Sequence, residues 1–159
     1  MRFAAHDDVT SIQSDLNAPD NMSKIEGYSD ERLHAAIDDT QMAVFVWEED
    51  DQWQGFCWLR KTSEGTKIEE FGVGAPGAGV GSRFFADVLD AVIQGDFPTP
   101  LSLAVAADNT AAIRFYERFG FMKSKLKPSA WKRRQGPIAD ALIMTHAHRS
   151  RPARNENMT

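Results

Sequence analysis

A glycine-rich segment between a predicted strand and the strongest predicted helix constrains this chain more than any other feature. Five glycines lie between Phe71 and Ser82, and no Asp or Glu occurs between Phe71 and Ala86. Glycines let the backbone approach a ligand closely, and the first N–H groups of the following helix carry the positive end of its dipole. The segment therefore predicts a binding site for an anion such as pyrophosphate. A surface turn before an amphipathic helix is the alternative interpretation.

Two common phosphate-binding motifs fit this segment poorly. Gly74 and Gly79 have the spacing of a Walker A loop, but Val80 stands where the phosphate-binding Lys would be. Residues 72–77 match G-x-G-x-x-G, yet Pro76 falls inside the match and too little chain follows for a doubly wound sheet. A P-loop ATPase or kinase is therefore disfavoured, and a dinucleotide-dependent enzyme is kept only as a distant alternative.

The hydrophobic pattern on both sides of the glycines predicts a mixed α/β architecture. Strands at 41–47 and 53–59 form an expected hairpin, and a further strand follows near 67–73. Apolar residues then recur at helical spacing from Gly79 to Gly95, and an apolar strand at 101–106 implies a parallel crossover. The other expected elements are a strand at 2–5, helices near 8–17 and 30–38, a helix that is capped by Asp108 or Asn109 and stops at Gly120, and strands near 120–126 and 138–146.

Length and composition predict one soluble domain over residues 1–148, with a polar and mobile tail at 149–159. The single cysteine, Cys57, excludes an internal disulfide, and no apolar stretch approaches the roughly 20 residues of a membrane helix. Met1–Asp8 lacks the apolar region of a signal peptide. We therefore expect a cytoplasmic protein without a membrane partner.

Charge is distributed unevenly along the chain. Residues 1–122 hold 9 Lys and Arg against 21 Asp and Glu, a net −12, whereas residues 123–159 hold 9 against 2, a net +7. An acidic body favours cationic substrates and a basic end favours phosphate, although both could be ordinary solvated charge. The basic segment Trp131–Arg134 could shape a substrate site, contact phosphate or face solvent. A nucleic-acid partner is disfavoured because the whole chain is acidic and no nucleic-acid module is recognised.

A second motif gives the segment around the glycines a specific identity. Residues 109–121 resemble the N-x-x-A-x-x-x-Y-E-x-x-G-F signature of the GNAT acyltransferases, with Asn109, Tyr116 and Gly120 in place. The glycine turn resembles the family's other motif, Q/R-x-x-G-x-G/A. The resemblance is firm over residues 67–122 and looser over 41–59. It implies the GNAT fold: a mixed, mostly antiparallel sheet of about seven strands with flanking helices, parallel only at the splayed pair 67–73 and 101–106.

The resemblance also implies which residues bind acetyl-coenzyme A as co-substrate. Gly79 and Gly81 occupy the two small positions of the family's pyrophosphate motif, but Pro76 replaces its opening Gln or Arg and has no N–H to donate. Phosphate binding is then expected from backbone N–H groups, with Arg83 as a side-chain contributor and Asn109 as helix cap and coenzyme contact. On the preceding strand, Phe71 and Val73 are expected beside the coenzyme, and the N–H of Val73 would polarise the thioester carbonyl. The expected N–H donors are Gly77, Ala78, Gly79, Val80, Gly81 and Ser82.

Acyl transfer to an amine needs a base for the ammonium and an acid for the departing thiolate. By resemblance, Tyr116 is the general acid, although a core tyrosine is the structural alternative. Glu69 and Glu70 are the two candidates for the base. Because adjacent strand residues point to opposite faces, Glu70 should share its face with Gly72 and Gly74, and Glu69 should share its face with Phe71 and Val73. The more open face favours Glu70, while a solvated carboxylate is an alternative for either residue.

The predicted function is an N-acetyltransferase that acts on a primary amine of an unidentified small molecule or peptide by direct transfer in a ternary complex. A non-catalytic acyl-coenzyme A binding or sensing module is the alternative. Cys57 is expected to be a buried apolar residue rather than a nucleophile. His146 and His148 lack a third ligand, so no metal is expected. The acceptor, the acyl-chain preference and the oligomeric state stay open, a homodimer included.

Overall fold

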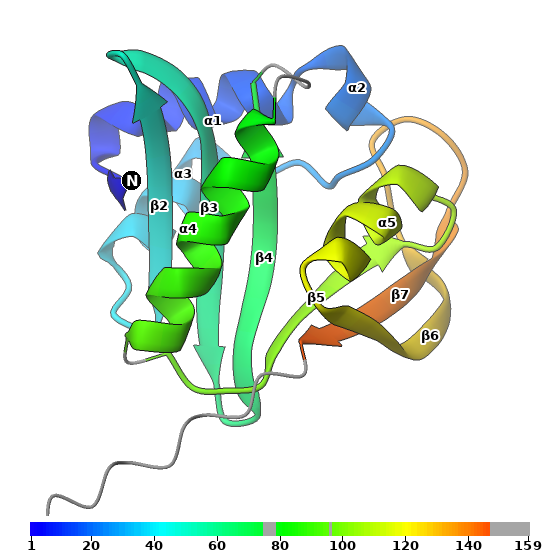
Figure 1. Ribbon diagram of the computed structural model, residues 1–159. Coiled ribbons are helices and arrows are strands. Elements are labelled where there is room, and N and C mark those ends of the chain that lie inside the picture. Colours follow the sequence, from blue (N-terminus) through cyan, green and yellow to red (C-terminus); the bar gives the residue numbers. More distant parts are fainter. Residues whose placement is uncertain (75–78, 96, 147–159) are drawn as a thin grey trace, which may run out of the picture.

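Seven strands form one sheet between two layers of helices (Figure 1). The computed structural model describes residues 1–74, 79–95 and 97–146. The strand order is β1-β2-β3-β4-β5-β7-β6, and every neighbouring pair is antiparallel except β4 and β5. The elements are β1 (Arg2–Phe3), a 3-10 turn (His6–Asp8), α1 (Val9–Leu16), α2 (Pro19–Met22), α3 (Asp30–Asp38), β2 (Met42–Glu49), β3 (Gln52–Thr62), β4 (Gly65–Val73), α4 (Val80–Gln94), β5 (Leu101–Ala106), α5 (Thr110–Arg118), β6 (Phe121–Trp131) and β7 (Ala139–His146). The expected mixed, mostly antiparallel sheet is confirmed.

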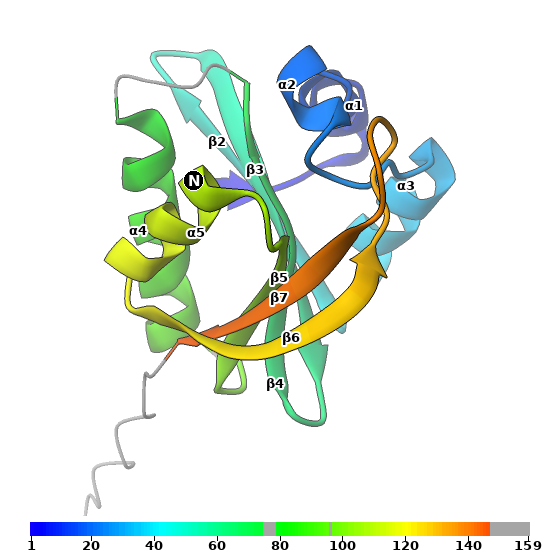
Figure 2. The same ribbon diagram turned by 90° about the vertical axis from the view of Figure 1, so that its right-hand side faces the viewer.

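Each face of the sheet carries its own hydrophobic core. Helices α4 and α5 cover one face, and α1, α2 and α3 lie on the other (Figure 2). Alternate residues of β2 supply the two cores: Phe45 and Trp47 pack on the α4 side, whereas Val44 and Val46 pack on the α1 side. A strand that is covered on both faces needs apolar residues at successive positions, which explains the unbroken run at 43–47.

The central strands β4 and β5 separate soon after they meet. Their parallel register covers only Thr66–Ile68 opposite Leu101–Leu103, after which β5 continues beside β7 and diverges from β4 (Figure 1). Beyond Ile68, none of the described residues forms a strand beside the edge of β4 that faces β5. The predicted splay is confirmed, and it opens the middle of the sheet beside the candidate site residues.

The caps of α4 and α5 follow from their sequences. Gly79 precedes α4 with φ of +72°, a left-handed conformation that glycine adopts without a steric penalty. Asn109 precedes α5, and its side-chain oxygen accepts a hydrogen bond from the Ala112 N–H at 3.3 Å. Of the two caps that the sequence left open, Asp108 and Asn109, the structure selects Asn109.

Three features differ from the sequence-based expectations. The short helix α2 was not anticipated, β1 is only two residues long, and β6 extends to Trp131, beyond the expected end near residue 126. The tail at 149–159 and the domain boundary at 148 lie outside the described residues, so both stay predictions. None of the helices in the described ranges has the length and apolar character that crossing a membrane requires.

Candidate active site

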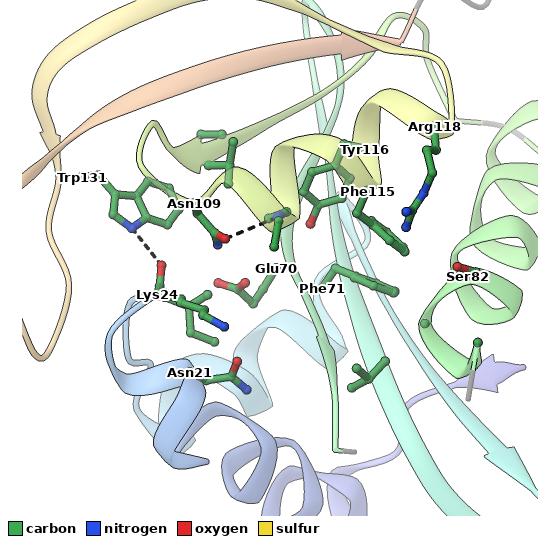
Figure 3. Close-up of a pocket in the computed structure, with 18 residues that line it drawn as sticks. Asn21, Lys24, Glu70, Phe71, Ser82, Asn109, Phe115, Tyr116, Arg118 and Trp131 are labelled. Atoms are coloured by element: carbon green, nitrogen blue, oxygen red, sulfur yellow. Dashed lines mark hydrogen bonds between the residues drawn. The ribbon is translucent and has the colours of Figure 1, made fainter. Parts of the chain in front are cut away.

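A cavity of about 490 Å³ occupies the gap between β4 and β5 (Figure 3). Its walls come from β4, β5, the first turn of α4, the inward side of α5, the segment after α2 and the end of β6. Ser82 and Arg118 lie at one side of the view, and Lys24, Asn21 and Trp131 lie at the other. The lining residues are Asn21, Lys24, Ile25, Glu70, Phe71, Val73, Gly79, Gly81, Ser82, Ala104, Val105, Asn109, Ala111, Ala112, Phe115, Tyr116, Arg118 and Trp131.

The side with Ser82 and Arg118, which we call the coenzyme end, fits a phosphate group. Gly79, Gly81 and Ser82 line it, and the N–H groups at the start of α4 have no partner within the helix. A Cβ on Gly81 would come within 3.8 Å of Val73 and 4.0 Å of Phe115, so the missing side chain leaves room beside the cavity. Arg118 adds a cation at this end, its guanidinium carbon 5.7 Å from the centre of the Phe115 ring.

The other predicted phosphate ligands are placed differently. Val80 packs its side chain against the hydrophobic core, which leaves only its backbone for a ligand. Arg83 pairs with Glu49 at 3.0 Å and lies over the Trp47 ring, and it is not among the residues that line the cavity. Gly77 and Ala78, like Pro76, lie outside the described residues.

Val73 places a backbone donor at the open edge of β4. The N–H of Gly74 donates to Gln54 O on β3 at 2.9 Å. Since successive N–H groups of a strand point to opposite edges, the N–H of Val73 points to the edge that β5 has left. Val73 and Phe71 both line the cavity, as does Asn109 across from them on α5.

Tyr116 is partly buried and packs among aromatic rings at the centre of the cavity. Its ring contacts Phe85, Phe115 and Phe121 with centroid separations of 5.5, 5.4 and 5.8 Å. The hydroxyl points into the cavity in Figure 3. Burial raises the pKa of Tyr116, and the charge of Glu70 raises it further. The phenol therefore keeps its proton at neutral pH, as a general acid must.

Glu70 brings a buried carboxyl to the same cavity. Only 8% of the residue is exposed, and desolvation raises the pKa of Glu70 to about 8. Hydrogen bonds from the Phe71 N–H and from Tyr28 oppose this increase in pKa, whereas the charges of Glu26 and Glu69 add to it. A carboxylate with a pKa near the working pH can accept a proton from an ammonium group, which an ordinary Glu does weakly. Glu70 is also the only carboxylate among the described residues that line the cavity.

Glu69 lies outside this cavity because of a β-bulge. In the register of β3 and β4, Trp58 pairs with Glu70 and Leu59 pairs with Ile68, so Glu69 is the extra residue. The expectation that Glu69 shares the face of Phe71 is wrong, because the bulge interrupts the alternation of side chains. Glu69 instead forms an ion pair with Arg60 and approaches Lys67 to 3.9 Å. It lines a second cavity of about 250 Å³.

The side of the cavity with Lys24 and Trp131, which we call the acceptor end, was largely missed from the sequence. Asn21, Lys24 and Ile25 come from α2 and the turn after it, where no motif marks them. Three hydrogen bonds from the segment 131–135 hold this wall: Trp131 Nε1 to Lys24 O at 2.9 Å, Arg133 Nη1 to Ser23 O at 3.1 Å and Gln135 N to Met22 O at 3.0 Å (Figure 3).

The two arginines after Trp131 contact protein groups. Arg133 also binds the Asp108 carboxylate at 2.9 and 3.1 Å, just before the cap of α5. Arg134 donates to the Asn17 side chain at 2.5 Å and to Leu16 O. Of the roles considered for this segment, the geometry shows that of a brace behind the acceptor end, and only Trp131 of the four residues 131–134 lines the cavity.

The remaining reactive side chains lie away from the cavity. Cys57 is fully buried in the core on the α4 side, and burial raises the pKa of its thiol, so the buried-residue interpretation is confirmed. His146 lies 2.9 Å from Phe119 O, and His148 is outside the described residues. Within residues 1–74, 79–95 and 97–146, no three His, Cys, Asp or Glu side chains gather as metal ligands would.

Comparisons with known proteins agree with this geometry. The profile of the acetyltransferase (GNAT) family matches residues 9–121. A comparison with curated protein sequences gave no match. Among solved structures, the ribosomal-protein-S18-alanine N-acetyltransferase of Escherichia coli aligns with a TM-score of 0.76 and 18% identity, over 91% of this chain and 90% of that one.

Two further structures show the same fold. The spermidine N-acetyltransferase of Vibrio cholerae, solved in complex with CoA and spermine, aligns with a TM-score of 0.76 and 22% identity, over 91% of this chain and 92% of that one. An N-acetyltransferase from Staphylococcus aureus Mu50 aligns with a TM-score of 0.77 and 14% identity, over 91% and 94%. Since the family profile spans most of the sequence and the folds agree, the chain belongs to the GNAT acetyltransferase family and is an acyltransferase of that family.

Proposed function

We propose that this protein transfers an acetyl group from acetyl-coenzyme A to a primary amine of a small molecule or peptide, with both substrates bound at once. One observation carries the proposal: two side chains that can transfer protons, the buried Glu70 and the partly buried Tyr116, line a single cavity at the point where β4 and β5 separate. The cavity extends from the N-terminus of α4, which suits an anion, to a separate end that is free to receive the acceptor.

The residues of the coenzyme end fit the donor. The N–H groups of Val80, Gly81 and Ser82 would hold the pyrophosphate, and the left-handed Gly79 directs the chain into α4. Arg118 would replace the side-chain donor, Gln or Arg, that the family motif has at the position of Pro76. Bound there, acetyl-coenzyme A supplies an activated acyl group as a thioester. Phe71 and Val73 on β4 would contact the coenzyme on one side, and Asn109 at the start of α5 would contact it on the other.

The proton transfers can be assigned to Glu70 and Tyr116. Glu70 accepts a proton from the acceptor ammonium, and the freed nitrogen lone pair forms the new C–N bond. The C–S bond then breaks, and Tyr116 gives a proton to the departing sulfur. The nitrogen, positively charged after attack, releases a second proton that restores Tyr116. Glu70 finally loses its proton to solvent, so the net reaction releases one proton.

The N–H of Val73 would stabilise the charge that develops on the carbonyl oxygen. It lies at the unpaired edge of β4 and beside the cavity. A fixed backbone donor of this kind, shielded from water, lowers the barrier more than a mobile group would. Because Glu69 is engaged by Arg60 and lies outside this cavity, we assign the base to Glu70 alone.

The test combines coenzyme binding with an amine panel. Calorimetry should detect binding of acetyl-coenzyme A to the protein. Release of the coenzyme thiol should depend on an added amine, and mass spectrometry should identify the acetylated amine. Tyr116→Phe should bind the coenzyme but release thiol slowly. Binding without turnover on any amine would favour a non-catalytic acyl-coenzyme A sensor. Absence of binding would overturn the site itself.

A cytoplasmic location and a homodimer stay predictions of the sequence. The buried, unpaired Cys57 agrees with a reducing compartment. Fractionation of cells that express the protein tests the first prediction, and the molar mass in solution tests the second.

A further inference from the structure

The cavity holds a cation, Lys24, at its acceptor end and a carboxyl group, Glu70, near its centre. Lys24 and Glu70 both line it, and Figure 3 shows the Lys24 side chain extending into the cavity beside Asn21. Within the part of the chain that the structure describes, Lys24 forms no ion pair. Its ammonium therefore offers a positive charge that has no ion-pair partner among the described residues.

The position of Lys24 is fixed although its side chain is exposed. Its carbonyl accepts a hydrogen bond from Trp131 Nε1 at 2.9 Å, and its N–H donates to Asn21 O at 3.0 Å. The residue before it is held by Arg133, whose guanidinium also binds Asp108. A lysine on a braced backbone presents its charge to a restricted part of the cavity, which a lysine on a mobile loop would not do.

Lys24 is placed on the far side of the cavity from the coenzyme phosphate site. In Figure 3, Ser82 and Arg118 lie on one side of Glu70 and Tyr116, and Lys24 and Asn21 lie on the other. Arg118 and the start of α4 supply positive potential for the donor. The charge of Lys24 therefore acts on the acceptor.

The combination of Glu70 and Lys24 selects for charge on the acceptor. Glu70 accepts the proton of the amine that reacts, whereas Lys24 repels a second cationic group on the same molecule and attracts an anionic one. We propose that the acceptor is a small zwitterion of the amino-acid type, with its amine at Glu70 and its carboxylate paired with Lys24. This inference rests on the proposed acetyltransferase function and names the substrate class of the same site.

Matched acceptors test the carboxylate directly. Each free L-amino acid would be compared with its own L-amino acid amide, which keeps the amine and side chain but lacks the negative charge, and spermidine would serve as a polycation. For the amino acids that are acetylated, we expect kcat/KM to exceed that of the amide by about 10- to 100-fold, the range of a charge-assisted hydrogen bond. The kcat/KM for spermidine should be lower than that for either the amino acid or its amide.

Variants of Lys24 assign the preference to this residue. Lys24→Gln should lower kcat/KM for the free amino acid by about 10- to 100-fold and leave that for the amide within about threefold. Lys24→Arg should retain most of the preference, and Lys24→Glu should reverse it. Lys123→Gln removes an exposed lysine of β6 that lines none of the three cavities found, and it should change neither rate.

The outcomes separate this inference from the function on which it rests. Preferred acetylation of amides or of spermidine, or a Lys24→Gln variant with an unchanged ratio of acid to amide, would overturn the zwitterion and leave the acetyltransferase intact. Coenzyme binding without acetylation of any amine would overturn both. An unchanged KM for acetyl-coenzyme A in the Lys24 variants shows that they are folded.

Discussion

The two ends of the cavity are built in different ways. The coenzyme end is formed by aromatic packing within residues 71–121, where Phe71, Phe85 and Phe115 lie with ring centroids 5.0 to 6.0 Å apart. The acceptor end is formed by hydrogen bonds between segments that are more than 100 residues apart in the sequence, such as the bonds from Trp131 to Lys24 and from Arg134 to Asn17.

This difference assigns different tasks to the two ends. Rings that pack against one another fix α4 and α5 against β4, which keeps the proposed donor site rigid. Directional bonds between surface segments hold the acceptor wall, and such segments tolerate substitution better than a core does. On the proposed function, the molecule thus combines a rigid donor site with an acceptor wall built from surface segments. The following predictions test that division.

The largest expected effect is on Tyr116, between the two ends. Tyr116→Phe keeps the ring packing and removes only the proton donor, so kcat should fall by about 1,000-fold while both KM values stay within about threefold. Steady-state kinetics with thiol detection measures this. Tyr28→Phe is the comparison, because it removes the hydroxyl that hydrogen-bonds Glu70; it should raise the pKa of Glu70 and leave kcat at high pH within about threefold. A Tyr116→Phe enzyme with more than a tenth of the normal kcat would contradict the assignment.

Glu70→Gln should lower kcat/KM by about 100-fold and change its pH dependence. Because the pKa of Glu70 is raised to about 8, the active carboxylate form increases with pH, and kcat/KM should rise about tenfold per pH unit below 8 and level off above it. The acceptor amine titrates in both enzymes, so the part of the profile that is lost in the Gln variant belongs to Glu70. Identical profiles for the two enzymes would exclude Glu70 as the base.

The free energy of unfolding should also depend on the ionisation of Glu70. It should fall as pH rises, whereas kcat/KM should increase. The folded state holds the Glu70 proton up to about pH 8, whereas the unfolded chain releases it near 4.5. The free energy of unfolding therefore decreases as pH rises through this window, because the folded state binds the extra proton. Asp15, whose pKa burial raises to about 6, adds the same trend from 3.8 to 6. Glu70→Gln should be more stable than the wild type at pH 8 and lose this advantage near pH 5, as urea unfolding at the two pH values would show.

The coenzyme end could be predicted from the sequence because its signals are local. Gly79 and Gly81 stand at the start of a helix with strong apolar periodicity, and Asn109 and Tyr116 share one motif. In each case a few neighbouring residues determine both the backbone conformation and the side that faces the cavity. Of the residues named for this end, Arg83 is the exception, because its partner Glu49 lies on β2 and no local pattern indicates that contact.

The acceptor end could not be predicted because its signals are distant. Nothing near Lys24 indicates that Trp131 and Arg133 will hold its backbone, and the short helix α2 has no amphipathic repeat. The position of Glu69 was missed for another reason: a bulge depends on the register with β3, which a single strand does not reveal. Pairing between distant segments is the information that was lacking.

Two arginine variants should distinguish the two ends, because each should raise the KM for one substrate by about tenfold. Arg118→Gln removes the cation of the coenzyme end and should raise the KM for acetyl-coenzyme A, while the KM for the acceptor should change little. Arg133→Gln loosens the brace on Ser23 and Asp108 and should raise the KM for the acceptor alone. Equal changes in both KM values for either variant would show that the two ends are coupled.

The smallest effects should come from two glycines at the coenzyme end. Gly79→Ala places a side chain in a left-handed conformation and should reduce the free energy of unfolding by about 1 kcal/mol. Gly81→Ala lies inside α4, where its Cβ would meet only ordinary contacts, so helix propensity should raise stability by about 0.5–1 kcal/mol. Yet the same methyl group enters the space that we assign to the coenzyme, so Gly81→Ala should bind acetyl-coenzyme A more weakly while it unfolds at higher denaturant. Tighter or unchanged binding in this stabilised variant would show that the phosphates lie elsewhere.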